Sequence, residues 1–282
     1  PPRSTPLYSS AASDVYKRQY NNYMIEFADV KGLLIDLEGV LYSDNKLIPG
    51  SIEVIKEFRK NNLKLRFLTN TTTTPRKLIF NKLQDFGFNI KEEEIFTPII
   101  ATKNYLRDNR VKKIALITNV EIIEEFNEYE ITQKNPEVVI MGDIYKNFKW
   151  EILDRIFKLV YLENSALIAL HRNKYCMRDG KISLDLGPFV KAIEYSSGKK
   201  SILMGKPEKN FFDLAVKDLE IIKDNILMIG DDITSDIEGS INANLKAIQV
   251  KTGKFQEKDL KKPTQPNYTI ESINALPKLL GY

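Results

Sequence analysis

The chain has 282 residues, of which 43% are hydrophobic and 28% are charged. This length fits one large or two ordinary domains, and no run approaches the roughly 18 apolar residues of a membrane span. The formal net charge of +4 is spread along the chain, so neither nucleic acid nor a membrane is an expected partner. The single Cys176 and single His171 exclude an intrachain disulfide and a Cys/His zinc site, and they favour a cytoplasmic location.

The first 23 residues show neither helical nor strand periodicity, so we expect a disordered tail without function. The stretch Asp14–Gln19 looks like the translation of a transposase adapter used in sequencing libraries. We therefore expect residues 1–19 to be an artefact of sequence assembly. The natural start is expected at Met24 or just upstream.

From Lys31 onward, predicted strands and helices alternate, which favours a mostly parallel sheet with helices on both faces. Apolar runs predict strands over residues 32–35, 64–68, 113–117, 137–141, 166–170, 201–204 and 225–229. Helices are predicted over residues 51–61 and 270–280. Two more are predicted from their capping residues: one begins at Pro75 after the cap Thr74, and the other begins after the cap Thr97. The lysine-rich segment 251–267 is predicted to be a surface connection.

Polar side chains follow the predicted strands at the points where these strands end. They are Asp36-Leu37-Glu38, Thr69-Asn70, Lys206, and the run from Asp231 to Asp236. Because the carboxyl ends of parallel strands line one crevice, we expect these segments to converge on one acidic pocket. Crowded carboxylates repel one another unless a cation lies between them, and oxygen ligands suit Mg²⁺. An ammonium in the same pocket would offset an anionic carboxylate and an incoming phosphate.

Four short motifs occur in order along the chain: Asp36-x-Glu38-Gly-Val, Thr69-Asn70, Gly205-Lys206-Pro207 and Gly230-Asp231-Asp232-x-x-x-Asp236. This order resembles the four motifs of the haloacid dehalogenase (HAD) superfamily. The insert between the second and third motifs resembles the subclass IIA cap, and Asp185–Tyr195 is similar to close relatives in that subclass. The resemblance implies an α/β protein with a Rossmann-like parallel-sheet core, residues 24–110 and 200–282, and an inserted α/β cap of the C2 type, residues 111–199.

The resemblance implies a Mg²⁺-dependent phosphohydrolase that acts through an aspartyl-phosphate on a small phosphorylated metabolite or pyrophosphate. Asp36 would be the nucleophile that attacks phosphorus. Thr69 and the backbone of Asn70 would hold phosphate oxygens. Lys206 would neutralise charge on the nucleophile and on the phosphate.

The resemblance also implies a set of Mg²⁺ ligands. Asp231 would bind the ion together with Asp36 and the backbone carbonyl of Glu38. Two further carboxylates, Asp232 and Asp236, are alternatives for holding water near the metal or for orienting the motif lysine.

One position departs from the family pattern. Phosphatases of this superfamily usually have Asp two residues after the nucleophile, as acid toward the leaving group and then as base toward water. This chain has Glu38, whose carboxylate is one methylene longer, and positioned proton transfer is worth ~10²–10⁴-fold in rate. An alternative function is therefore a catalytically impaired, HAD-like protein that binds a phospholigand. Retention of Asp36, Lys206 and Asp231 favours the enzyme, because a binding protein needs no nucleophile.

Residues of the predicted cap are candidates for substrate contact. Arg172, Asn173 and Tyr175 follow a predicted strand in this region, whereas His171 is expected to be structural. Relatives in the family often dimerise through the cap, which makes a homodimer of that kind a candidate assembly, but the sequence leaves the oligomeric state open. The sequence leaves open which phosphorylated molecule is the substrate.

Overall fold

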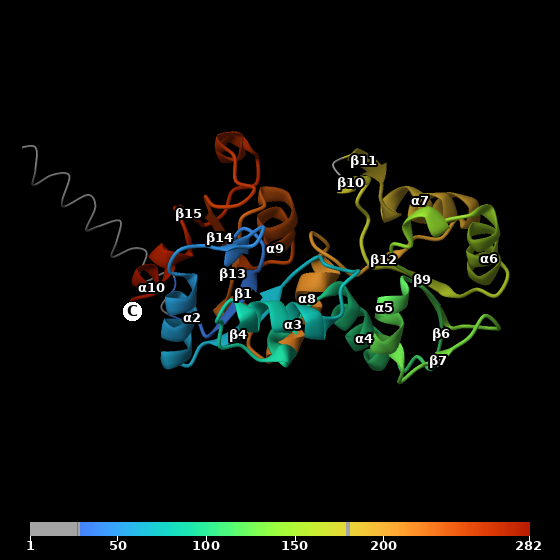
Figure 1. Ribbon diagram of the computed structural model, residues 1–282, viewed down its shortest axis with the longest axis horizontal. Coiled ribbons are helices and arrows are strands. Elements are labelled where there is room, and N and C mark those ends of the chain that lie inside the picture. Colours follow the sequence, from blue (N-terminus) through green and yellow to red (C-terminus); the bar gives the residue numbers. More distant parts are fainter. Residues whose placement is uncertain (1–26, 28, 179–180) are drawn as a thin grey trace, which may run out of the picture.

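Two parallel β-sheets organise the chain (Figure 1). The structure, a computed structural model, describes residues 27, 29–178 and 181–282, so the tail predicted over residues 1–23 lies outside the described residues. The larger sheet has the strand order β15-β14-β13-β1-β4-β5, and the smaller has the order β12-β9-β8-β6-β7. All strand pairs in both sheets are parallel, as the alternating pattern predicts.

The strands of the larger sheet are β1 (Gly32–Asp36), β4 (Lys64–Leu68), β5 (Ile95–Phe96), β13 (Ile226–Gly230), β14 (Lys246–Val250) and β15 (Tyr268–Ile270). Those of the smaller sheet are β6 (Lys113–Ile117), β7 (Glu130–Ile131), β8 (Val138–Met141), β9 (Ala166–Ala169) and β12 (Ile202–Leu203). Two antiparallel hairpins accompany them, β2 (Tyr42–Ser43) with β3 (Lys46–Leu47), and β10 (Tyr175–Arg178) with β11 (Lys181–Leu184).

The longer helices connect successive strands. They are α2 (Ser51–Lys60), α3 (Arg76–Asp85), α4 (Pro98–Asp108), α6 (Trp150–Tyr161), α7 (Leu186–Ser197) and α8 (Lys209–Leu219). The described residues also include three short helices, α5 (Val120–Ile123), α9 (Gly239–Asn242) and α10 (Leu276–Leu279). None of the helices in the described ranges has the length and apolar character needed to cross a membrane.

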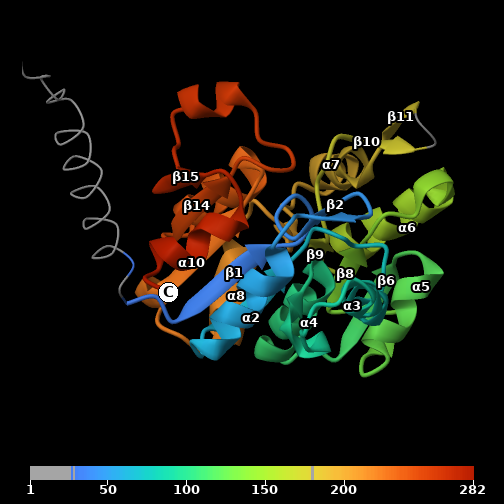
Figure 2. The ribbon, with the colours of Figure 1, turned by 60° about the vertical axis from the view of Figure 1, so that its left-hand side comes forward.

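The central strand β1 is buried on both faces. Leu33 and Ile35 pack into one apolar cluster together with Phe58 of α2, whereas Leu34 packs into a second cluster with Phe211 and Phe212 of α8. In Figure 1, β1 lies between α2 and α8, and in Figure 2, which brings the left-hand side forward, α2 lies in front of the sheet. A strand covered on both faces has a continuous apolar sequence, and the unbroken run from Gly32 to Ile35 is of this kind. The α/β class predicted from the sequence is confirmed, whereas the predicted domain limits stay a prediction.

The helix starts test the capping patterns. The Thr97 side chain accepts a hydrogen bond from the Ile100 N–H at 3.2 Å, and Pro98 is the first helical residue of α4, as predicted. The prediction for α3 is wrong by one residue, because Pro75 takes the cap position and the helix begins at Arg76. A proline has no backbone N–H and can stand in either place without losing a helical hydrogen bond.

The prediction of a helix over residues 270–280 is wrong at its start. Tyr268, Thr269 and Ile270 form β15, an edge strand that pairs with β14. β-branched and aromatic residues favour a pleated edge. The helical part is the short α10, in which Pro277 lies in the first turn.

Candidate active site

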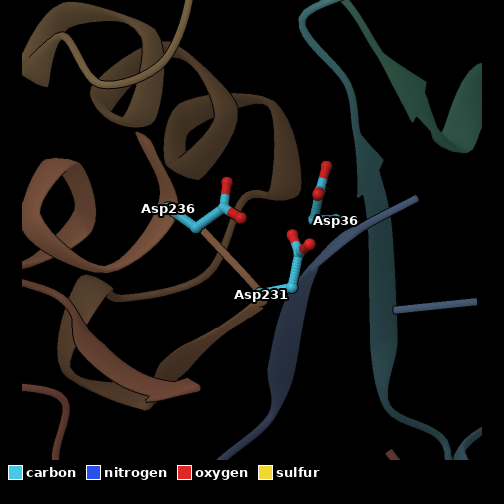
Figure 3. Close-up of side chains that lie close together, drawn as sticks. All are labelled: Asp36, Asp231 and Asp236. Atoms are coloured by element: carbon cyan, nitrogen blue, oxygen red, sulfur yellow. The ribbon is translucent and has the colours of Figure 1, made fainter. Parts of the chain in front are cut away.

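Three carboxylates meet at the carboxyl edge of the larger sheet (Figure 3). Asp36 is the last residue of β1, Asp231 directly follows β13, and Asp236 lies on a π-helical segment, Ile233–Glu238. One ligand oxygen from each carboxylate lies within 4.8 Å of the other two, and all three residues are buried. The convergence predicted from the strand ends is therefore present in the structure.

Lys206 joins two of these carboxylates. Its Nζ donates hydrogen bonds to Asp36 Oδ1 and to Asp236 Oδ1, each at 2.6 Å, and its side chain is 3% exposed. The lysine reaches this point because Asn70 clamps its backbone. Asn70 Nδ2 donates to the Lys206 carbonyl at 2.9 Å, and Asn70 Oδ1 accepts from the Lys206 N–H at 2.8 Å. The sequence did not predict this side-chain role for Asn70.

Burial controls the protonation of the acidic cluster. It raises the pKa of Asp36 to about 6, a rise that Lys206 opposes and Asp231 adds to. Burial and the charge of Asp236 raise the pKa of Asp231 to about 6, and burial and the charge of Asp36 do the same for Asp236. Burial disfavours the Lys206 ammonium, but the two carboxylates outweigh it and raise the Lys206 pKa above its usual range.

The residues around Asp231 fit a divalent cation. Asp231 Oδ2 accepts the Lys254 N–H at 2.6 Å, whereas the buried Oδ1 has no hydrogen-bond partner among the described residues. Backbone approaches the carboxylate closely at Gly39 (φ 87) and Gly253 (φ 62), where an added Cβ would lie 2.1 Å from Asp231 Oδ2. The unpartnered Asp231 oxygen lies beside two further carboxylates, and in the described part of the chain Lys206 is the one ammonium that contacts this group of three acids. Such an arrangement suits an ion coordinated by oxygen, such as Mg²⁺.

A cleft of about 230 Å³ opens over this cluster. It is lined by five of the site residues predicted from the sequence, Asp36, Glu38, Thr69, Asn70 and Lys206. Ser235, from the predicted run 231–236, also lines it, together with Thr71 and Lys254, which were not predicted. Residues 251–267 form the mostly exposed connection that the sequence predicts, and this connection also brings Lys254 to the cleft, a role that was not predicted. The signal was available, because Lys254 follows the carboxyl end of β14 and so belongs to the same sheet edge.

The remaining motif carboxylates have distinct partners. Glu38 is exposed, and its Oε1 accepts the Asp44 N–H at 2.6 Å in the turn between β2 and β3. Asp232 Oδ1 accepts the backbone N–H groups of Thr234 and Ser235 at 2.9 and 3.1 Å, which fixes the start of the π-helical segment. Of the two candidates for orienting Lys206, Asp236 is therefore the one that contacts it.

The predicted cap residues do not line this cleft. Arg172 Nη2 lies 3.3 Å from Glu208 Oε1, and the exposed Asn173 accepts the Gly187 N–H at its carbonyl. Tyr175 is exposed on β10, so the substrate contacts of these three residues stay a prediction. His171 is buried with its Nε2 3.6 Å from Asp185 Oδ1, and burial lowers its pKa.

Comparisons with known proteins agree with this arrangement. A family model for haloacid dehalogenase-like hydrolases matches residues 33–132, and a second model for HAD-like hydrolases matches residues 203–276. The chain is 35% identical to haloacid dehalogenase-like hydrolase domain-containing protein 2 of Mus musculus, over 86% of this chain and 93% of that protein. It is 34% identical to phospholysine phosphohistidine inorganic pyrophosphate phosphatase of Xenopus laevis, over 89% and 95%. The solved structure of 4-nitrophenylphosphatase from Thermotoga maritima matches with a TM-score of 0.80 and 25% identity, over 90% of this chain and 99% of that chain.

Proposed function

Since this chain belongs to the haloacid dehalogenase-like hydrolase family, we propose that it is a Mg²⁺-dependent phosphohydrolase that acts through an aspartyl-phosphate. The observation that carries the proposal is the buried pair of Asp36 and Lys206 at the floor of the cleft. With a pKa of about 6, Asp36 is mostly ionised at neutral pH and available as a nucleophile.

Two displacements at phosphorus account for the reaction. In the first, a carboxylate oxygen of Asp36 forms a bond to phosphorus as the bond to the leaving oxygen breaks, and Glu38 gives that oxygen a proton. In the second, water attacks the same phosphorus and loses a proton to Glu38, which releases phosphate and restores Asp36. Thr69 and the backbone of Asn70, which line the cleft, hold the phosphoryl oxygens throughout.

Asp36, Asp231 and the backbone carbonyl of Glu38 are the groups that would hold Mg²⁺. The ion, when bound, offsets negative charge on the phosphoryl group. Lys206 contributes a fixed positive charge to the same region, because Asp236 and Asn70 hold it in place.

The proposed substrate is a small phosphorylated metabolite or pyrophosphate. Its support is the small cleft and the names of two relatives, an inorganic pyrophosphate phosphatase and a 4-nitrophenylphosphatase. A homodimer formed through the cap and a cytoplasmic location belong to the same proposal. The location is supported by the single Cys176, which leaves no intrachain disulfide to form.

The proposal predicts hydrolysis of 4-nitrophenyl phosphate and of pyrophosphate with Mg²⁺, and loss of both activities with EDTA. Added Mg²⁺ should also raise the melting temperature of wild type, because it relieves repulsion in the acidic cluster. The same addition should not raise the melting temperature of Asp231→Ala, which lacks the orphaned oxygen. Calorimetry that finds undiminished Mg²⁺ binding by this variant would reject the ligand role of Asp231.

Glu38→Gln tests the departure from the family pattern. Turnover of alkyl phosphates should fall by roughly 10²–10⁴-fold, because their leaving groups need a proton. Phosphoryl transfer from 4-nitrophenyl phosphate should fall far less, so a burst followed by a slow steady state is expected. Glu38→Asp restores a carboxylate and should keep or raise activity.

Equal rates for Glu38→Gln and wild type on both substrates would show that the side chain transfers no proton. If neither wild type nor Glu38→Asp turns over any phosphorylated compound, the alternative of a phospholigand-binding protein is favoured.

A further inference from the structure

We propose that a second cleft, which runs along α4, binds a small polyanion that carries two or more phosphate or carboxylate groups. This α4 cleft has a volume of about 630 Å³, and none of its lining residues lines the active-site cleft. Figure 1 shows α4 at the junction between the larger and the smaller sheet. The volume lies in the range of about 300–1,000 Å³ typical of small-molecule sites.

Positive charge dominates the α4 cleft. Its basic lining residues are Arg66, Arg76, Lys103, Arg107, Arg110 and Lys112. Three acidic residues accompany them, so cations outnumber anions by three within one concave surface. The whole chain carries a formal net charge of +4 on 282 residues. The excess of basic residues is therefore concentrated at this cleft, and a concave surface with an excess of one charge attracts counter-ions.

Two of the acidic residues are already neutralised within the cleft. Asp218 Oδ2 accepts a hydrogen bond from Arg66 Nε at 2.6 Å, and Glu128 Oε1 lies 3.0 Å from Lys103 Nζ. After these two pairs, Glu93 is the one acidic residue of the described lining left to offset the remaining basic lining residues. The positive charge that is free for a ligand is thus concentrated at the end of α4.

A buried polar chain holds Arg107 in position at this end. Asn104, which is 8% exposed, accepts a hydrogen bond from Arg107 Nη2 at 2.9 Å. Its amide Nδ2 in turn lies 3.4 Å from Asp218 Oδ1, and Asp218 is fixed by Arg66. The Arg107 guanidinium is therefore oriented by a neutral amide and keeps its full charge for a ligand.

Among the described residues, Arg107, Arg110 and Lys112 form no ion pair. The charge of Lys112 contributes only as a minor cause to the lowered pKa of Glu137, which lies outside the cleft. Within the described ranges Arg76 Nε has no hydrogen-bond partner, but it lies 3.5 Å from Glu92 Oε1, an acidic residue outside the cleft lining, so Arg76 is not one of the free cations. Unpaired guanidinium groups with planar donors are well suited to phosphate and carboxylate oxygens. Because several of these unpaired cations line the same cleft, a ligand with several anionic groups fits better than a single phosphate.

Calorimetry with inorganic tripolyphosphate and, in a separate arm, with citrate tests the proposal on the full chain in EDTA. Arg110→Gly is the key variant, because Arg110 has a φ of 56°, which glycine adopts without strain. It removes one cation and should leave the melting temperature unchanged or higher. We expect about tenfold weaker binding of the polyanion, as for loss of one charged hydrogen bond, and a similar loss for Arg107→Gln.

Two controls separate this cleft from other anion sites. Lys56→Ala removes an exposed cation on α2, outside the cleft, and should change the affinity by less than about twofold. Thr69→Val removes a hydroxyl of the active-site cleft and should likewise leave this affinity unchanged. Binding by tripolyphosphate, citrate or both identifies the anionic group that the cleft prefers. Absence of binding to wild type at millimolar concentration, equal binding by the Arg110 and Arg107 variants, or a loss confined to Thr69→Val would overturn the proposal.

Discussion

Asp36→Asn is expected to lower the rate of 4-nitrophenyl phosphate hydrolysis by a factor on the order of 10⁴ or more, because an amide cannot form the covalent bond to phosphorus. The reaction of wild type, quenched with acid and followed by mass spectrometry, should place a phosphoryl group on Asp36. The variant should show none. These two measurements separate loss of the nucleophile from loss of substrate binding.

The fold should survive this substitution, and the reason lies in the charge of the cluster. Asp36 contributes to the raised pKa of Asp236, and Asp231 contributes to the raised pKa of Asp36. Removing the Asp36 charge relieves this repulsion, while the amide oxygen still accepts the hydrogen bond from Lys206. The metal-free variant should therefore melt no lower than wild type.

Asp85→Asn is the matched control for Asp36→Asn. It changes the charge by the same amount, but at a residue that is exposed at the end of α3. It should keep the wild-type rate within about twofold. Wild-type rates in a pure Asp36→Asn preparation would refute the nucleophile, and phosphorylation at another residue would relocate it.

The position of the site was predictable because sheet topology is encoded locally. The apolar runs that end at Asp36 and just before Asp231 predict adjacent buried strands, and parallel strands bring their carboxyl ends to one edge. The order β13-β1-β4 places these two residues and Thr69 side by side. Elementary sheet geometry thus leads from the sequence to the acidic cleft.

The contacts that the sequence did not predict depend on the paths of loops. The Asn70 amide clamps the backbone of Lys206, a residue 136 positions away, and Lys254 reaches Asp231 from the loop after β14. These hydrogen bonds form when distant segments are folded together, and no local pattern of residues encodes them. The predicted cap gives the opposite case. Arg172 has the side-chain chemistry expected for substrate contact, but it pairs with Glu208 and does not line the cleft.

Lys206→Met is expected to affect both stability and activity. The ammonium donates to Asp36 and Asp236 at 2.6 Å and is almost fully buried. Its removal leaves two buried carboxylates without a counter-charge, which costs about 3–5 kcal/mol of unfolding free energy. Loss of a fixed positive charge beside the phosphoryl group should also lower the rate by roughly 10²–10³-fold.

The pH dependence of this stability loss identifies its electrostatic origin. Lys206 lowers the pKa values of Asp36 and Asp236, which burial nevertheless raises to about 6 from the ordinary 3.8. In Lys206→Met both pKa values rise further, so the folded variant binds more protons than the unfolded chain at and above pH 6. Its stability therefore falls as pH rises through that range. In EDTA, the difference in melting temperature between wild type and variant should be larger at pH 8 than at pH 5.

A second substitution separates charge from packing. Asp236→Asn added to Lys206→Met removes one of the two unpaired carboxylates, so the double variant should regain part of the lost stability, a coupling that a double-mutant cycle measures. Activity should not return, because the charge beside Asp36 is still missing. Two results together would show that the methionine destabilises by its shape: an equal difference in melting temperature at pH 5 and pH 8, and no gain in stability in the double variant. Lys206 would then be a packing residue, and the fixed positive charge that the proposed mechanism requires would have to come from Lys254, the other cation that lines the cleft.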